Sequence, residues 1–184
     1  VLMPCSFARD EPIEEVIDAM RSLEGEGIKL FFTGNHSGFR RREPLPSNVQ
    51  FTGFMPLGEY EGMLQDVDAV MVLTTGEHVM VCGAYEAVAA EKPLITSAKR
   101  VLEDYFTPAG FVDNTWESIA EGLRSTRENA DELREEVKHF RKRIEVQWAE
   151  TFAELVELVD EEIPKPVPVS SLLGNWTSEG RRGT

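Results

Sequence analysis

The sequence predicts an α/β fold: a doubly wound, Rossmann-like parallel sheet in three layers, with helices on both faces. Apolar runs of strand length recur along the chain and are mostly continuous, which is typical of strands that helices cover on both sides. Helical patterns separate these runs, and strand–helix alternation favours a parallel sheet. The predicted strands are Val1–Cys5, Ile28–Thr33, Val49–Phe54, Ala69–Leu73, Leu94–Ser97 and Gly110–Val112.

The first helical pattern follows the first strand. Asp10 is the expected N-cap, and Pro12 suits the first turn, where the missing N–H costs nothing. Apolar residues then recur at helical spacing until Gly25, which ends the pattern. Two shorter helices are predicted over residues 59–67 and 83–90.

After residue 114 a helical pattern runs almost unbroken to residue 162, which predicts long C-terminal helices. Its apolar stripe indicates packing in the core or against another domain. Residues 163–184 are rich in Pro, Ser and Gly, so we expect a disordered tail there and one domain over residues 1–162. The stripe comprises Leu133, Val137, Phe140, Ile144, Trp148, Phe152, Leu155, Leu158 and Val159.

The charge of the chain bears on the partners that it can bind. The chain has 184 residues, with 33 acidic against 19 basic ones and a formal net charge of −14. Such a chain repels phosphate, which argues against nucleic acid as a partner. Arg40–Arg42 is a candidate anion patch, and in so acidic a chain we expect a solvated loop with local counter-charges; the alternative is contact with an anionic acceptor or a lipid head group.

Apolar run lengths and cysteine usage bear on location. The longest apolar run, Ala69–Leu73, is far shorter than the about 18 residues of a membrane span. Cys5 and Cys82 are too few for a disulfide framework, and we interpret both as small buried residues. We expect a cytoplasmic protein, with peripheral contact at the inner face of the membrane as an alternative. Because the chain begins at Val1 inside an apparent strand, we expect a fragment of a longer protein.

Small and polar residues follow the predicted strands, and open parallel sheets bind ligands at the carboxyl ends of their strands. Backbone can approach a phosphate closely where side chains are small, and helix N-termini supply N–H donors. The sequence therefore predicts a nucleotide crevice at this edge. Its candidate residues are Ser6, Arg9, Gly34, Phe54, Thr75, Glu77 and His78.

The segment after the fourth strand carries the clearest signal. Val81, Cys82 and Gly83 open a helix whose N-terminus can cradle a diphosphate. Glu86 lies one turn further on, where its carboxylate can accept hydrogen bonds from both hydroxyls of a ribose. The alternative is that Glu86 is a solvated residue near a favourable helix end. No carboxylate cluster has metal-binding spacing, so we expect no metal and no cofactor.

The same residues resemble a known family. Gly83–Ile95, which reads GAYEAVAAEKPLI, looks like the helix-and-strand signature E-A-x-A-x-G-x-P-V-[IV] of group-1 retaining glycosyltransferases of the GT-B fold. Asn48–Phe54 matches their N-V-x-F-x-G-x strand, and Asp66–Val70 matches the start of another strand. Pro4–Pro12 is similar to the start of the second domain in one branch. The resemblance covers about residues 1–160 in the correct order.

The resemblance implies an enzyme with two Rossmann-like domains, of which this chain looks like the C-terminal, donor-binding half. Its substrate would be a UDP- or GDP-linked sugar, transferred to an acceptor hydroxyl with retention of configuration, in a hexosyltransferase type of reaction. The N-terminal acceptor-binding domain would be its partner, and the chain alone would be inactive.

Residue by residue, the match is incomplete. The family's E-x(7)-E motif places one carboxylate near the donor sugar and the second on the ribose, and Glu86 matches the second. The first falls on His78, with Glu77 beside it, so both are candidate catalytic residues. Phe54 corresponds to the segment whose backbone commonly contacts the base in this family, with packing in the core as the alternative. The family also carries an Arg and a Lys after the first strand, whereas this chain has Arg9 alone. That departure favours a second hypothesis, a non-catalytic nucleotide-sugar-binding or assembly module.

Overall fold

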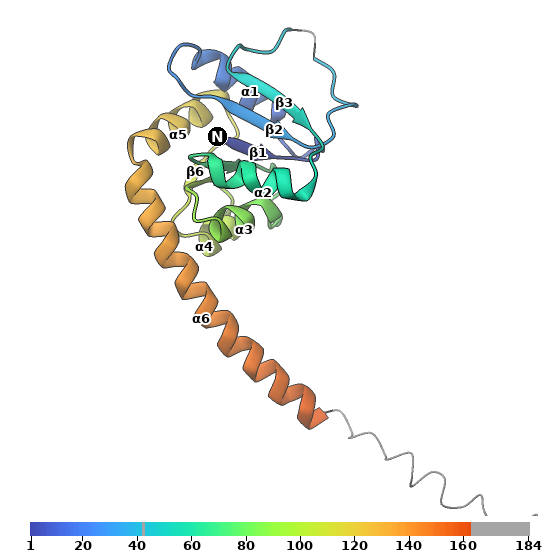
Figure 1. Ribbon diagram of the computed structural model, residues 1–184, viewed down its shortest axis with the longest axis vertical. Coiled ribbons are helices and arrows are strands. Elements are labelled where there is room, and N and C mark those ends of the chain that lie inside the picture. The colour runs from blue at the N-terminus through green and yellow to red at the C-terminus, as the bar shows by residue number, and fades with distance from the viewer. Residues whose placement is uncertain (42, 163–184) are drawn as a thin grey trace, which may run out of the picture. The chain divides into compact units, whose positions relative to one another are not determined.

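A computed structural model describes residues 1–41 and 43–162 of the chain (Figure 1). The predicted tail, residues 163–184, lies outside the described residues. The described part contains a six-stranded sheet in the order β3-β2-β1-β4-β5-β6, with every pairing parallel, which confirms the predicted fold class. The strands are β1 (Leu2–Pro4), β2 (Leu30–Thr33), β3 (Val49–Gly53), β4 (Val70–Val72), β5 (Leu94–Ser97) and β6 (Gly110–Val112).

Helices cover both faces of this sheet and complete the three layers (Figure 1). Leu2 and Met3 are neighbours in β1 and are 0% and 1% exposed, yet they belong to two different cores. Side chains alternate across a strand, so each core fills one face of the sheet. One core includes α1 and α5, and the other includes α2, α3, α4 and the first part of α6. The helices are α1 (Ile13–Ser22), α2 (Leu57–Asp66), α3 (Cys82–Ala89), α4 (Arg100–Tyr105), α5 (Trp116–Glu128) and α6 (Ala130–Glu162).

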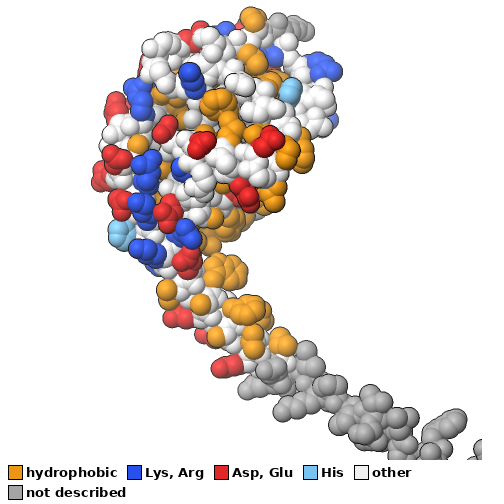
Figure 2. All heavy atoms as spheres, in the orientation of Figure 1, with side chains coloured by type: hydrophobic (Ala, Val, Ile, Leu, Met, Phe, Trp, Pro, Cys, Tyr) orange, Lys and Arg blue, Asp and Glu red, His pale blue; other side chains and the backbone are white. Residues whose placement is uncertain are grey.

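The described residues fall into two units, residues 1–144 and residues 145–162, and one domain over residues 1–162 stays a prediction. In the first unit, Val137 and Phe140 of α6 are buried, as the apolar stripe predicts. In the second unit, hydrophobic side chains are exposed along α6 (Figure 2). These side chains belong to Val146, Trp148, Phe152, Leu155, Val156, Leu158 and Val159.

Two local predictions need correction. Pro12, not Asp10, occupies the N-cap position of α1, because the Asp10 carboxylate instead accepts a hydrogen bond from Thr74 Oγ1 at 3.0 Å. Helix α4 was not predicted, since it has six residues and only Leu102 buried among them. No helix among the described residues is long and apolar enough to cross a bilayer.

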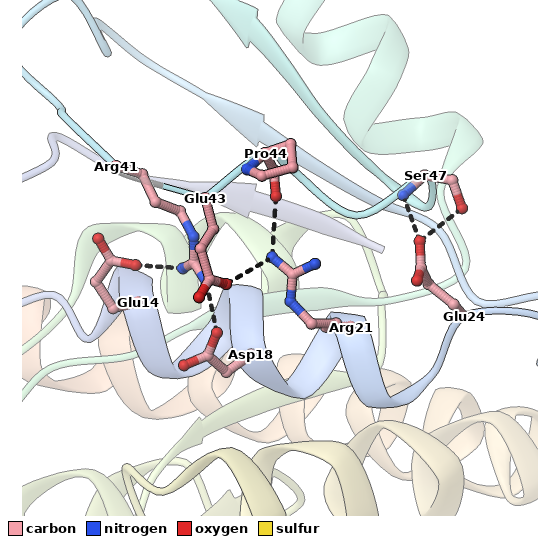
Figure 3. Close-up of polar contacts among 8 residues, drawn as sticks. All are labelled: Glu14, Asp18, Arg21, Glu24, Arg41, Glu43, Pro44 and Ser47. Atoms are coloured by element: carbon pink, nitrogen blue, oxygen red, sulfur yellow. Dashed lines mark hydrogen bonds and ion pairs between the residues drawn. The ribbon is translucent and has the colours of Figure 1, made fainter.

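In the arginine run of the β2–β3 connection, Arg41 is counter-charged, as expected (Figure 3), whereas residue 42 lies outside the described residues. The Arg41 side chain is 10% exposed and lies between carboxylates of α1 and its own loop. It pairs with Glu14, with Asp18 at 2.5 Å and with Glu43 at 3.6 Å. Arg21 of α1 donates to the Pro44 carbonyl at 2.9 Å, so several contacts hold this connection against the helix.

Replacing Arg41 by methionine should therefore lower the free energy of unfolding by about 1 kcal/mol at low salt, because the loop loses its ion pairs to α1. Urea denaturation at low and high salt measures this, and the difference should shrink at high salt. Arg40→Met is the matched control, because Arg40 donates only to the nearby carbonyls of Ser37 and Phe39. Equal losses for the two variants would contradict the prediction.

Candidate functional site

A pocket of about 380 Å³ lies at the carboxyl ends of β1 and β4. The β1–α1 loop, the β4–α3 loop and the first turns of α3 line it. A Cβ on Gly83 would come within 2.8 Å of the Pro4 side chain and 2.9 Å of the Val72 side chain. Glycine at this position therefore lets α3 begin close against the two strands. Of the predicted site residues, the pocket brings together Ser6, Val81, Cys82, Gly83 and Glu86.

A second cavity, of about 240 Å³, lies at the opposite edge of the sheet and is lined by residues such as Val1, Ile28 and Ala69. Each of these residues precedes or begins a strand, whereas ligands of open parallel sheets bind beyond the carboxyl ends. None of the predicted site residues lines this cavity. We therefore place the candidate site at the carboxyl edge.

Glu86 is half-buried in the pocket and is held by a residue that sequence reasoning missed. Tyr60, on α2, donates its hydroxyl proton to Glu86 Oε2. Burial raises the pKa of Tyr60, and the hydrogen bond to Glu86 raises it further, so the phenol stays protonated and remains a donor. The two residues are 26 positions apart in sequence, and no motif in the chain signals the contact.

The side chain of Glu11 hydrogen-bonds to backbone groups of its own loop, the β1–α1 loop. Its carboxylate accepts from the backbone N–H groups of Ser6 at 3.0 Å and Ala8 at 2.8 Å. Phe7 between them adopts a left-handed conformation, with φ of 58°. Arg9 is exposed and lies outside the residues that line the pocket. The loop thus presents a carboxylate, where the family resemblance led us to look for cations.

His78 and Glu77 are both exposed on the β4–α3 loop and lie outside the pocket lining. Lys99 Nζ donates to Glu77 Oε1 at 2.5 Å. That hydrogen bond, together with the positive charge of Lys99, holds the pKa of Glu77 below its usual value. Lys99 follows β5, so a cation that was not among the predicted site residues lies at the carboxyl edge of the sheet.

A buried polar network fastens the loops at this edge. Thr74 is 1% exposed; its N–H donates to Ser97 Oγ at 2.9 Å, and its hydroxyl donates to Asp10. Asn114 closes the network: it accepts from Ser97 Oγ at 2.7 Å and donates Nδ2 to the Thr74 carbonyl at 2.8 Å. The loops after β1, β4, β5 and β6 are therefore connected before any ligand binds.

The remaining predicted residues do not line the pocket. Gly34 has φ of 121°, and a Cβ there would lie 1.9 Å from the Cys5 carbonyl oxygen, so the close approach of two loops requires glycine. Phe54 is 86% exposed, which a role in the core does not explain. Thr75 is exposed and donates its N–H to the Asp10 carbonyl at 2.7 Å. Within residues 1–41 and 43–162, no group of His, Cys, Asp and Glu side chains is arranged to hold a metal ion.

The two cysteines differ in exposure, and the expectation that Cys82 is buried is wrong. Cys82 is exposed because it is the first residue of α3, at the mouth of the pocket. Cys5 is half-buried, and desolvation, with the nearby charge of Glu11, raises the pKa of its thiol to about 12.

Alkylation should therefore distinguish the two thiols. At about pH 8 we expect iodoacetamide to modify Cys82 and to leave Cys5 unmodified, because the thiolate is the nucleophile and Cys5 stays protonated. Peptide mass spectrometry over a time course measures both rates, with Cys82→Ser as the control that removes the fast site. Equal labelling of the two residues in the folded protein would contradict this prediction.

A six-stranded parallel sheet with helices on both faces is a doubly wound α/β fold, and such folds bind ligands at the carboxyl ends of their strands. The family model for glycosyl transferases group 1 matches residues 1–144, and the chain belongs to this family. No curated protein matches the chain.

Solved structures show the same fold. Sucrose-phosphate synthase from Thermosynechococcus elongatus is 18% identical over 87% of this chain and 44% of its own, with a TM-score of 0.66. HepE from Anabaena, solved in complex with UDP and glucose, is 14% identical over 83% of this chain and 48% of its own, with a TM-score of 0.63. A glycosyltransferase from Rickettsia africae is 14% identical over 77% and 42%, with a TM-score of 0.60. The chain thus spans less than half the length of these proteins.

Proposed function

We propose that this chain is the donor-binding half of a glycosyltransferase that moves a sugar from a UDP- or GDP-linked donor to an acceptor hydroxyl, with retention of configuration. The observation that carries the proposal is Glu86, held by Tyr60 in a pocket at the start of α3. A helix N-terminus favours a diphosphate, and a carboxylate one turn on favours the ribose hydroxyls. Membership of the family and the UDP complex of the Anabaena protein support this assignment.

The other roles follow from the geometry of the edge. The N–H groups at the start of α3 would face the departing diphosphate, and Arg9, on a neighbouring loop, would supply charge. Because Lys99 engages Glu77, His78 is the better group to accept or donate hydrogen bonds at the donor sugar. Lys99 would add a second positive charge to that of Arg9 on the β1–α1 loop.

An N-terminal acceptor-binding domain would complete the enzyme, and we expect little transfer by this chain alone. The proposal is supported by the share of the matched structures that the chain spans, 42–48%. Exposed apolar residues along α6 from Val146 onward would suit packing against further protein. A cytoplasmic location, with contact at the inner face of the membrane as the alternative, belongs to the same proposal.

The second candidate function is a non-catalytic nucleotide-sugar-binding or assembly module. The observation that favours it is the Glu11 carboxylate, which already accepts the hydrogen bonds of the Ser6 and Ala8 N–H groups that a phosphate would need. Asp10, Glu11 and Glu86 all line the pocket, and the lining includes no Lys or Arg. Without a compensating cation, a developing diphosphate charge there would be poorly stabilised.

Calorimetric titration with UDP, GDP and ADP tests the donor site. We expect one of them to bind, and Glu86→Gln to weaken that binding about tenfold, because hydrogen bonds to a charged group are lost. Glu59→Gln, which changes an exposed carboxylate of α2, is the matched control and should leave the affinity unchanged. Absence of binding at millimolar concentration would overturn the proposal.

Joining the chain to an N-terminal domain and measuring sugar release separates the two functions. Turnover supports the transferase. Tight binding of the nucleotide-sugar donor without turnover in the joined protein would overturn the glycosyltransferase proposal and favour the non-catalytic module.

A further inference from the structure

Tyr60 and Glu86 form a pair whose hydrogen-bonding capacity is unusually restricted. The single hydroxyl proton of Tyr60 is already donated to Glu86 Oε2. An ionised carboxylate has no proton to donate, so the pair together offers only acceptors to a ligand. The described lining of the pocket includes no Lys or Arg beside Glu86. A ligand group that satisfies the pair must therefore bring O–H or N–H donors of its own.

The pair is also held in place from both sides. The Tyr60 ring packs against the core that α3 and α4 share, which restricts where its hydroxyl can lie. Glu86 is on α3 between buried neighbours Ala84 and Ala87, so its backbone is equally fixed. The hydrogen bond from Tyr60 to Oε2 restricts the carboxylate, whose oxygens keep capacity to accept from a ligand in the pocket. A carboxylate without this restraint would lose side-chain entropy on binding a ligand.

We propose that Tyr60 is a positioning residue that orients Glu86 for a vicinal diol and thereby sets a preference for ribonucleoside over 2′-deoxyribonucleoside diphosphates. This inference rests on the proposed function, since it takes Glu86 as the ribose ligand. Sites built to hydrogen-bond a substrate hydroxyl discriminate against analogues that lack it, because a polar group of the site is then left unpaired. The orientation of the carboxylate decides whether both hydroxyls are used.

The test compares each nucleoside diphosphate that binds, UDP or GDP, with its 2′-deoxy analogue by calorimetry. We expect the wild-type chain to prefer the ribose form about tenfold. Tyr60→Phe should reduce that preference to about threefold or less, while the affinity for the deoxy analogue changes less than about twofold. A merely structural role of Tyr60 would lower both affinities alike, so the ratio is the informative quantity.

Two further variants complete the design. Tyr105→Phe removes a hydroxyl from another ring packed on the same core and should leave the preference unchanged. Glu86→Asp keeps the charge but withdraws the carboxylate from Tyr60, so it should reproduce the loss of preference and serves if Tyr60→Phe does not fold.

The outcomes separate the two proposals. Full preference retained in a folded Tyr60→Phe variant, or in Glu86→Asp where Tyr60→Phe does not fold, together with binding weakened in Glu86→Gln, would overturn the role of Tyr60 and leave the donor site standing. Unchanged binding in Glu86→Gln, or no nucleoside diphosphate bound by the wild-type chain, would overturn both.

Discussion

Gly34→Ala should destabilise the protein by about 3–5 kcal/mol, the largest loss we expect from a single methyl group. Two causes act together at this position. The backbone φ of 121° is one that residues with a side chain rarely adopt, and the new Cβ would lie 1.9 Å from the Cys5 carbonyl oxygen. That oxygen belongs to backbone at the end of β1, so it cannot move aside without shifting the loop that lines the pocket. Denaturant unfolding followed by circular dichroism measures the loss.

Gly62→Ala is the matched control, because Gly62 lies in α2 and nothing within 4 Å would meet its Cβ. Alanine there should raise the free energy of unfolding by about 0.5–1 kcal/mol through its higher helix propensity. Similar results for the two variants would refute the close approach of the β1 and β2 loops. A large loss at Gly34 would also show that glycine is needed there for packing, whether or not a ligand contacts it.

Asn114→Ala is expected to lower the free energy of unfolding by about 2–4 kcal/mol. The substitution leaves the Thr74 carbonyl and the Ser97 hydroxyl without their partner, in a region where Thr74 and Ser97 are fully buried. Because the network fastens the β4–α3 loop, amide hydrogen exchange of Thr75 and Gly76 should also become faster. Denaturant unfolding and exchange measured by mass spectrometry test the two effects.

The control for this prediction is Asn129→Ala. Asn129 is exposed at the C-terminal end of α5 and donates only to Ser125, so its loss should change stability by less than about 0.5 kcal/mol. If Asn114→Ala behaved like this control, the network would not contribute to the rigidity of the site.

The fold class could be predicted from the sequence because each buried parallel strand has a local apolar pattern of its own. Each strand is an apolar run such as Leu94–Ser97, and the pattern needs no knowledge of its neighbours. Helix α4 escaped prediction because Leu102 is its one buried residue, which leaves no periodic stripe to detect. Asp10 was misread as a helix cap because its partner, Thr74, is 64 positions away in sequence.

Only part of the site could be predicted, because the sequence shows local patterns but not contacts between distant residues. Glu86 and the small residues before it form a local pattern, and the rule for parallel sheets places that pattern at the ligand edge. Tyr60, Lys99 and Asn114 act through contacts to residues 17 to 40 positions away, which one sequence does not reveal. The exposure of Cys82 likewise depends on how α3 meets β1 and β4 rather than on its neighbours in the chain.

The topology gives the short strand β1 a mechanical role. Leu2 pairs with Phe31 on one side and with Val70 on the other, so β1 joins the β2–β3 ribbon to the β4–β5–β6 ribbon. These two ribbons share no other strand within the sheet. Strand β1 has only three residues, and a pulling force applied at Val1 would act directly on its pairing with β2 and β4. Withdrawal of β1 would part the sheet into two pieces rather than peel one edge.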